Sequence, residues 1–328
     1  MQKNIWTTGN VVLACLSFII LIMSALALNG CTKLQEPLLR VASNVWPGYE
    51  TLYLARSLGY YDNKNIRLVE MPSNSQVSQA LRNNMIEAAC LTLDEALSLM
   101  QDGMDLRVVL IMDVSHGADA MMARPGIDTL QSLRGQRIGV ENAAVGAVML
   151  DAALEAGNLQ AKDITIVPLT VDEHAAAYLA GKIDAAVTFE PVRSQLLKEG
   201  AHILFDSSQI SGRIVDVLVV RSEIAYLHQK ALKELLTGHF RAREHLASQP
   251  QDAEQRMTLR LGGNALAQFT GLKIPDIKEN RSLLGGNTPP LKITAGALAD
   301  LMLRRSLLQK AVAVDHLADP SFLPERNQ

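Results

Sequence analysis

The sequence predicts an α/β protein of two similar lobes, each a mixed, mainly parallel sheet flanked by helices. The first observation is an internal repeat: Arg40-Val41-Ala42 recurs as Arg137-Ile138-Gly139, and Ile86-Glu87-Ala88-Ala89 recurs as Ile183-Asp184-Ala185-Ala186. The offset stays at 97 or 98 residues, too long for a solenoid and about the size of a small domain. The second is an alternation of short apolar runs with helical patterns, which favours parallel strands joined by helices. Two lobes leave a cleft between them, where small ligands commonly bind.

The first copy alternates strands and helices from its first apolar run onward. Gly59 stands in the usual position after a helix, and Ser73 or Asn74 can cap the next helix. We expect strands at Leu39–Ser43, Ile66–Met71, Ala88–Leu91 and Leu106–Met112, and helices at Thr51–Leu58, Ser75–Asn83 and from Leu93.

The second copy follows the same course. Gly157 ends its first helix, and Pro191 suits the first turn of its last helix, where a missing N–H costs nothing. We expect strands at Arg137–Val140, Ile164–Leu169 and Ala185–Thr188, and helices at Ala144–Ala156, Glu173–Ala180 and after Pro191.

The remaining chain carries one further apolar strand, Val215–Val220, and then amphipathic helices broken by Gly-Gly and Pro-Pro pairs. Because this tail has too few strands for its own sheet, we expect it to pack on the first lobe. Residues 39–123 and 215–328 would then form lobe 1, and residues 124–214 lobe 2. The chain would cross between the lobes twice, and two crossings form a hinge on which a clamshell can close.

The N-terminus predicts export. Val11 to Leu28 is a nearly unbroken apolar run, and Leu28-Asn29-Gly30-Cys31 resembles a bacterial lipobox. We expect residues 1–30 to be a lipoprotein signal peptide, Cys31 to be lipidated and residues 31–38 to be a tether. An uncleaved membrane anchor with an incidental cysteine is the alternative. Both place the remaining chain outside the cytoplasm, in the periplasm or on the outer cell surface.

Composition excludes several functions. The formal charge of the 328 residues is −3, with no basic block, so nucleic acid is not an expected partner. Cys90 lies in an apolar strand and reads as a buried, inert thiol. No metal-ligand spacing, phosphate-binding loop or nucleophile motif is present, so we expect no cofactor, no metal and no catalytic residue.

The candidate site lies at the carboxyl ends of the strands, where parallel sheets gather ligands. Trp46 would form an aromatic wall, although a loop tryptophan can also cap a core edge. Glu190 could face the cleft or could stabilise a helix start. The candidate ligand contacts are Asn44, Trp46, Tyr49, Ser73, Asn74, Thr92, Asp113, Ser115, Glu141, Asn142 and Glu190.

The charges near these strand ends are mainly acidic. Only His116 and Arg213 lie nearby as possible cations. An anionic ligand in a closed cleft would normally find an arginine or lysine. The imbalance therefore favours a neutral or cationic ligand, such as an amine or an aminopyrimidine. The acidic residues are Asp113, Asp119, Glu141, Asp172, Glu190 and Asp216.

A family resemblance is carried by several stretches of the mature chain, from about Leu39 to the C-terminus. They are Asn44-Val45-Trp46-Pro47-Gly48-Tyr49-Glu50, Gly59-Tyr60-Tyr61, Gly117-Ala118-Asp119, Leu133-Arg134-Gly135-Gln136-Arg137, Leu179-Ala180-Gly181-Lys182-Ile183-Asp184 and Phe189-Glu190-Pro191. With the lipobox, they resemble the solute-binding proteins of ABC importers, of the nitrate, sulfonate and taurine type that includes binders of thiamine pyrimidine precursors.

The resemblance implies the type 2 periplasmic binding fold and capture of a small molecule between the lobes. It also implies delivery to a membrane permease driven by an ATPase. Related fungal pyrimidine synthases share the fold but carry a cysteine-rich stretch that this chain lacks, which argues against an enzyme. Two alternatives stay open: a lipid-tethered sensor reporting to a membrane signalling receptor, and an enzyme on the same fold.

Overall fold

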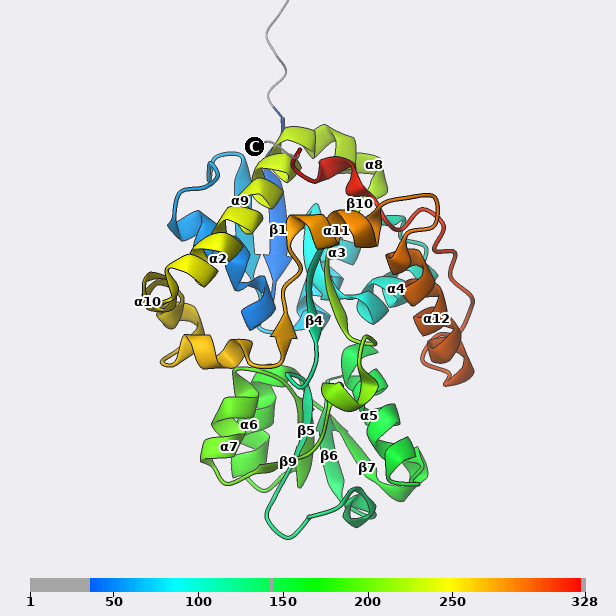
Figure 1. Ribbon diagram of the computed structural model, residues 1–328. Coiled ribbons are helices and arrows are strands. Elements are labelled where there is room, and N and C mark those ends of the chain that lie inside the picture. Colours follow the sequence, from blue (N-terminus) through cyan, green and yellow to red (C-terminus); the bar gives the residue numbers. More distant parts are fainter. Residues whose placement is uncertain (1–35, 142–143, 326–328) are drawn as a thin grey trace, which may run out of the picture. The chain divides into compact units, whose positions relative to one another are not determined.

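The computed structural model describes residues 36–141 and 144–325. The predicted signal peptide, Cys31 and Asn142 lie outside these residues. From Pro37 onward, the chain forms two separate sheets, each flanked by helices (Figure 1). The fold class predicted from the sequence is therefore confirmed. No helix in the described part of the chain is both long and apolar enough to span a membrane.

The first sheet has six strands. Their bounds are β1 Leu39–Ser43, β2 Ile66–Glu70, β3 Ala88–Thr92, β4 Leu106–Ser115, β10 Val215–Arg221 and β11 Leu272–Lys273. The spatial order is β11-β4-β10-β3-β1-β2. β1 runs parallel to β2 and β3, whereas β10 runs antiparallel to β3 and β4. The first residues of β10 therefore lie beside the last residues of β3 and β4.

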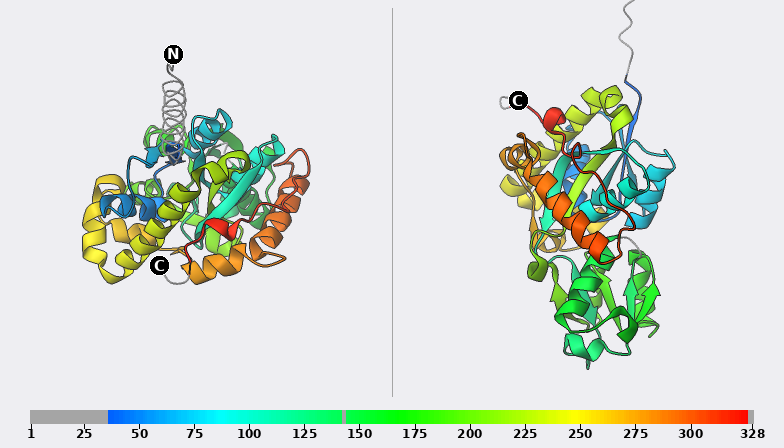
Figure 2. Two further views of the ribbon diagram at one scale, coloured as in Figure 1. Left: turned by 90° about the horizontal axis from the view of Figure 1, so that it is seen from above. Right: turned by 90° about the vertical axis from the view of Figure 1, so that its right-hand side faces the viewer.

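Helices from the first copy and from the C-terminal tail surround this sheet (Figure 2). Their bounds are α2 Glu50–Ser57, α3 Asn74–Arg82, α4 Leu93–Gln101, α8 Ser222–Ala225, α9 Gln229–Ser248, α10 Pro250–Leu261, α11 Ile277–Leu284 and α12 Pro290–Arg304. α9 packs on α2, α11 on β4 and α12 on α4, so these helices of the tail cover the first sheet and its helices.

The second sheet has five strands in the order β7-β6-β8-β5-β9. Its elements are β5 Ala120–Ala123, β6 Arg137–Val140, α5 Ala144–Ala156, β7 Thr165–Pro168, α6 Val171–Leu179, β8 Ala185–Thr188, α7 Val192–Lys198 and β9 His202–Asp206. β6 is parallel to β7 and β8, and β5 is antiparallel to β8 and β9. Each sheet thus has an antiparallel strand, β10 or β5, in the same relative place.

The sequence located the repeated elements to within a few residues but missed β5, β9 and β11. Because β5 pairs within the second sheet, the chain leaves the first sheet between Ser115 and Ala120, a few residues before the boundary expected after residue 123. It returns between Asp206 and Val215, which includes the expected second crossing.

The repeat is visible in side-chain contacts as well as in the strand order. The Arg40 backbone N–H and Nε donate to Glu87 Oε2 at 2.8 and 2.9 Å. In the second lobe, the Arg137 backbone N–H and Nε donate to Asp184 Oδ2, both at 2.9 Å. In each lobe, this arginine–carboxylate pair joins the first strand of the copy to the residue that precedes its third strand.

Candidate ligand-binding cleft

Side chains from both lobes meet around two small adjoining cavities. Each cavity encloses about 10 Å³, which is room for about one water molecule, so the cleft is closed on its own side chains. Asn44, Trp46, Tyr49, Asn74, Thr92, Asp119, Val145, Phe189 and Asp216 line the first cavity. Asp119, Glu141, Val145, Gly146, Met149, His174, Val187 and Phe189 line the second.

Trp46 joins the two lobes at this closure. Its indole N–H donates to Asp113 Oδ2 at 3.0 Å, and its ring meets Phe189 edge to face, with centroids 5.4 Å apart. Gly48 permits this arrangement because a Cβ there would lie 1.7 Å from Asp113 Oδ2 and 2.6 Å from the indole nitrogen. The expected aromatic wall is thus oriented by one carboxylate and covered by a ring from the other lobe.

Asp216 completes a row of polar side chains across the first sheet. It pairs in register with Thr92 on one side and with Asp113 on the other, because β10 runs antiparallel to both neighbouring strands. The Tyr49 hydroxyl donates to Asp216. Three of the four residues in this group are predicted site residues, and the antiparallel strand adds the fourth.

Burial raises the pKa of acidic side chains in this wall of the cleft and beside it. Desolvation raises the pKa of Asp94 and of Asp113 to about 7, that of Glu95 to about 8 and that of Asp119 to about 6. Desolvation and then the neighbouring charge of Asp113 raise the pKa of Asp216 well above its usual range. Several of these groups therefore keep a proton near neutral pH, since they cannot all ionise in a space closed to water.

The cleft offers acceptors but little positive charge. Among the described residues, neither cavity is lined by a lysine or an arginine. Burial lowers the pKa of His174 to about 4, so its imidazole is neutral at pH 7. Asn44 Oδ1 and Asp119 Oδ2 are buried and accept no hydrogen bond within the described structure. A ligand with N–H donors would satisfy such oxygens, and an anion would not.

Glu141 contacts both lobes. Its Oε1 accepts from the Ser75 backbone N–H at 2.9 Å, in the first turn of α3, and its Oε2 accepts from the Val171 N–H at 3.2 Å, in the first turn of α6. The side chain is buried. Of the predicted site residues that the structure describes, Glu141 is the one that lines the second cavity.

The other predicted residues have different surroundings. Ser73 Oγ caps α3, and the hydroxyls of Ser115 and Ser207 lie 2.8 Å apart. Glu190 accepts from Arg193 Nη1 at 2.9 Å and from the Ser194 N–H and hydroxyl at 3.0 Å. These contacts correspond to the helix-start alternative for Glu190. None of the three predicted residues lines either cavity.

Several lining residues were left out of the predicted ligand contacts, including Asp119, Val145, Phe189 and Asp216. Asp216 begins a strand, so a search at the carboxyl ends of parallel strands does not select it. Phe189 directly follows β8 and was detectable by that search, but its apolar side chain carries no polar signal. Val145 lies in the first turn of α5, where an apolar residue looks like ordinary core.

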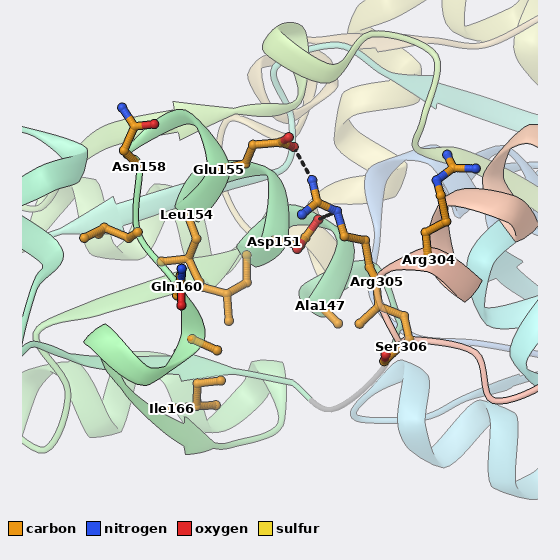
Figure 3. A pocket seen from close by; sticks show the side chains of 14 residues that line it. Ala147, Asp151, Leu154, Glu155, Asn158, Gln160, Ile166, Arg304, Arg305 and Ser306 are labelled. Carbon is orange, nitrogen blue, oxygen red and sulfur yellow. Dashed lines mark ion pairs between the residues drawn. The ribbon is translucent and has the colours of Figure 1, made fainter.

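A larger cavity, of about 710 Å³, lies elsewhere between α5 and the end of α12 (Figure 3). Arg305 reaches across it to Asp151, at 3.1 Å, and to Glu155, at 2.7 Å. Its lining includes none of the predicted site residues. We place the candidate site at the small closed cavities because the buried, incompletely paired acceptors gather there.

Comparison with known proteins gives a family and a fold. The model of the NMT1-like family matches residues 33–261. A putative aliphatic sulfonates-binding protein of Bacillus subtilis (strain 168) is 21% identical over 325 residues, with 93% of each chain covered.

Solved structures with this fold include binding proteins and an enzyme. The alkanesulfonate-binding protein SsuA from Xanthomonas axonopodis pv. citri, bound to MOPS, has a TM-score of 0.69 and 20% identity, covering 88% of this chain and 99% of that one. The desulfurization enzyme DszB has a TM-score of 0.63 and 19% identity, covering 87% and 97%. The solved relatives named as binding proteins agree with the expectation of a non-enzymatic protein, and DszB shows that the fold also supports chemistry.

Proposed function

The chain belongs to the NMT1-like family, and from this and its acidic cleft we propose that it is the solute-binding component of an ABC importer. It captures a small neutral or amine-containing molecule between its lobes and delivers it to a membrane permease driven by an ATPase. Lipidation of Cys31 tethers it outside the cytoplasm. The names of the relatives and the two-lobed fold support the importer role.

The observation that carries the ligand class is the group of buried carboxyls at the first cavity: Asp119 and Asp216 line it, and Asp113 lies beside Asp216 and accepts from the Trp46 indole. Each is fully or almost fully buried, and desolvation raises the pKa of each. A bound amine would offer N–H donors to these carboxyls and let them ionise, because an opposite charge nearby favours the ionised form. Trp46 and Phe189 would cover its apolar part.

The relatives' names mention sulfonates, and this cleft differs from what a sulfonate needs. A sulfonate has acceptor oxygens and a fixed negative charge, so it would require N–H donors or a guanidinium in the cleft. The described lining has neither a lysine nor an arginine, and its carboxyls would repel the anion once ionised. We therefore assign this chain a different ligand class from the sulfonate-binding relatives.

The test begins with the full-length chain extracted from a bacterial membrane in detergent. Intact and native mass spectrometry then report three properties together: loss of residues 1–30, addition of lipid to Cys31, and any molecule that co-purifies. An unprocessed mass would favour the uncleaved anchor. A co-purified molecule with basic nitrogen would support the amine assignment, and a sulfonate would contradict it.

Thermal-shift titration with butylamine, an aminopyrimidine and butanesulfonate then tests the ligand class directly. We expect one of the nitrogen compounds to raise the melting temperature and butanesulfonate to leave it unchanged. Asp216→Asn should weaken that response about tenfold or more, since it removes a buried charge partner. Asp315→Asn, an exposed carboxylate paired with Lys292, is the matched control and should respond like wild type. Stabilisation by butanesulfonate alone would refute the assignment.

A further inference from the structure

Glu141 accepts a hydrogen bond from the start of one helix in each lobe, and the two helices occupy equivalent positions in the repeat. α3 covers Asn74–Arg82 and α6 covers Val171–Leu179, each bound shifted by 97 residues. The two oxygens of one buried carboxylate are divided between them. Closure of the cleft is what places this single side chain on both helices.

Helix starts attract anions because their first N–H groups lack partners within the helix and carry partial positive charge. Local caps already occupy part of each start: Ser73 Oγ accepts from the Gln76 N–H, and Glu173 Oε2 accepts from the Thr170 N–H. The Ser75 and Val171 N–H groups donate to Glu141 instead.

The backbone next to Glu141 leaves no room for a side chain at position 146, in the helix that follows. A Cβ at Gly146, in the first helical turn after it, would lie 2.6 Å from the Glu141 carbonyl oxygen. A side chain at position 146 would therefore displace the strand end that presents the carboxylate. Asn44, the residue at the same place in the first copy, has no charge to offer, and its Oδ1 accepts no hydrogen bond in the described structure.

We propose that Glu141 is a built-in anion that fastens the two lobes together, occupying the paired helix starts where an anionic solute group could otherwise bind. The consequence for ligand choice rests on the function proposed above: with this position filled by the protein, an acidic solute head group is displaced and the cleft is left to a neutral or cationic one. The fastening itself does not depend on which solute binds.

The test is hydrogen–deuterium exchange on the full-length, ligand-free protein in detergent, followed by mass spectrometry of peptides from the starts of α3 and α6. In Glu141→Ala, both starts should exchange about tenfold faster than in wild type, because both N–H groups lose their acceptor. Formate added to Glu141→Ala should restore protection at both starts together, since it supplies a carboxylate of the right size. Glu141→Gln keeps the volume but has one amide oxygen, so it should leave one of the two starts unprotected.

Glu173→Ala is the matched control. It removes a carboxylate from the start of α6 that contacts only Thr170 of the same lobe, so the α3 start should keep its wild-type exchange. Unchanged exchange at α3 in Glu141→Ala would overturn the proposal. Loss of protection that formate does not restore would also overturn it, because the position would then not accept a free anion. Neither outcome bears on the amine titration, so failure here is distinguishable from failure of the proposed function.

Discussion

The two lobes share a scaffold and differ where they face each other. Arg40 with Glu87, and Arg137 with Asp184, make the same contacts in the two copies. At the cleft the likeness ends. The first lobe presents the carboxyl of Asp216 with the polar groups of Asn44, Asn74 and Thr92, whereas the second presents mainly Val145, Val187 and Phe189 beside Glu141. The two copies therefore agree in strand and helix placement and differ in their inner faces. With the ligand site proposed above, one face would recognise polar groups of the solute and the other would cover them.

One pair of equivalent positions shows how this difference arises. Asn44 and Glu141 both follow the first strand of their copy. The asparagine stays within the first lobe as a buried acceptor, whereas the glutamate reaches across to the other lobe. A carboxylate has two oxygens and can accept a hydrogen bond from each of two helix starts. An amide has a single oxygen, which can bind one helix start and accepts a weaker hydrogen bond because it is uncharged. The lobes therefore close asymmetrically, with the second lobe supplying the fastening group.

The largest effect that would separate the two faces is a loss of stability with rising pH, which arises from the first. The buried carboxyls there have pKa values raised to about 6 to 8, and the pKa of Asp216 is raised well above its usual range, whereas in the unfolded chain they titrate near 4. Their contribution to stability is present below the unfolded pKa and is lost as pH rises through the folded pKa. The free energy of unfolding of the ligand-free protein should therefore fall by several kcal/mol between pH 5 and pH 8, at about 1.4 kcal/mol per unit of pKa separation for each group.

Urea denaturation at both pH values measures this loss. Asp216→Asn should reduce it and should be more stable than wild type at pH 8, because an uncharged amide replaces a carboxyl that is ionised in the unfolded chain and must take up a proton to be buried. The buried His174 of the second lobe acts in the opposite sense: its pKa of about 4 makes stability fall as pH drops from about 6. A stability that stays level from pH 5 to pH 8 would mean that the carboxyls of the first lobe are hydrated.

The elements within each copy of the repeat could be predicted from the sequence, whereas strands that depend on distant partners could not. Elements within each copy were detectable because their apolar runs and helix ends are local, and β1, β6, α5 and β8 agree with the expected bounds. β5, with the sequence Ala-Met-Met-Ala, has no β-branched residue and is a strand only because it pairs with β8 and β9. Its identity depends on partners that are distant in the chain.

The site was predictable where it depends on strand ends and was missed where it depends on strand direction. Trp46, Thr92 and Asn44 lie at or just after the ends of parallel strands, and all three line the first cavity. Asp216 lies at the opposite end of its own strand, and only the antiparallel pairing of β10 brings it there. Glu190 also follows a strand, but its carboxylate accepts from the helix that begins beside it, which corresponds to the helix-start alternative.

A smaller effect would test whether the equivalent arginine–carboxylate pairs of the two copies, Arg40 with Glu87 and Arg137 with Asp184, contribute equally to stability. Glu87 and Asp184 make corresponding contacts, but 9% of the Glu87 side chain is exposed and 18% of the Asp184 side chain. Glu87→Ala should lower the free energy of unfolding by about 2 kcal/mol, because it leaves the Arg40 N–H and guanidinium without their acceptor. Asp184→Ala should cost less, since water can replace more of the lost contact.

Urea midpoints of the two variants at pH 7 measure this difference. Both carboxyls have a pKa held low by their arginine, so the contribution of each pair is lost as pH falls through the folded pKa. The two variants should therefore approach the wild type in stability in acid. If Asp184→Ala lowered the free energy of unfolding as much as Glu87→Ala or more, the exposed fraction of the carboxylate would not determine the contribution of each pair. The second lobe would then depend on its pair for another reason.

The smallest effect is expected from the exposed contact between the lobes. Arg305 meets Asp151 and Glu155 across the large outer cavity, and all three side chains remain partly accessible to water (Figure 3). Exposed ion pairs contribute less than about 1 kcal/mol, so Arg305→Ala should change exchange at the α3 start by less than about fivefold. Arg304→Ala is the control, because Figure 3 shows its side chain directed away from both carboxylates. If Arg305→Ala instead exposed the α3 start as strongly as Glu141→Ala, closure would be fastened at the outer surface, and the buried carboxylate would merely follow it.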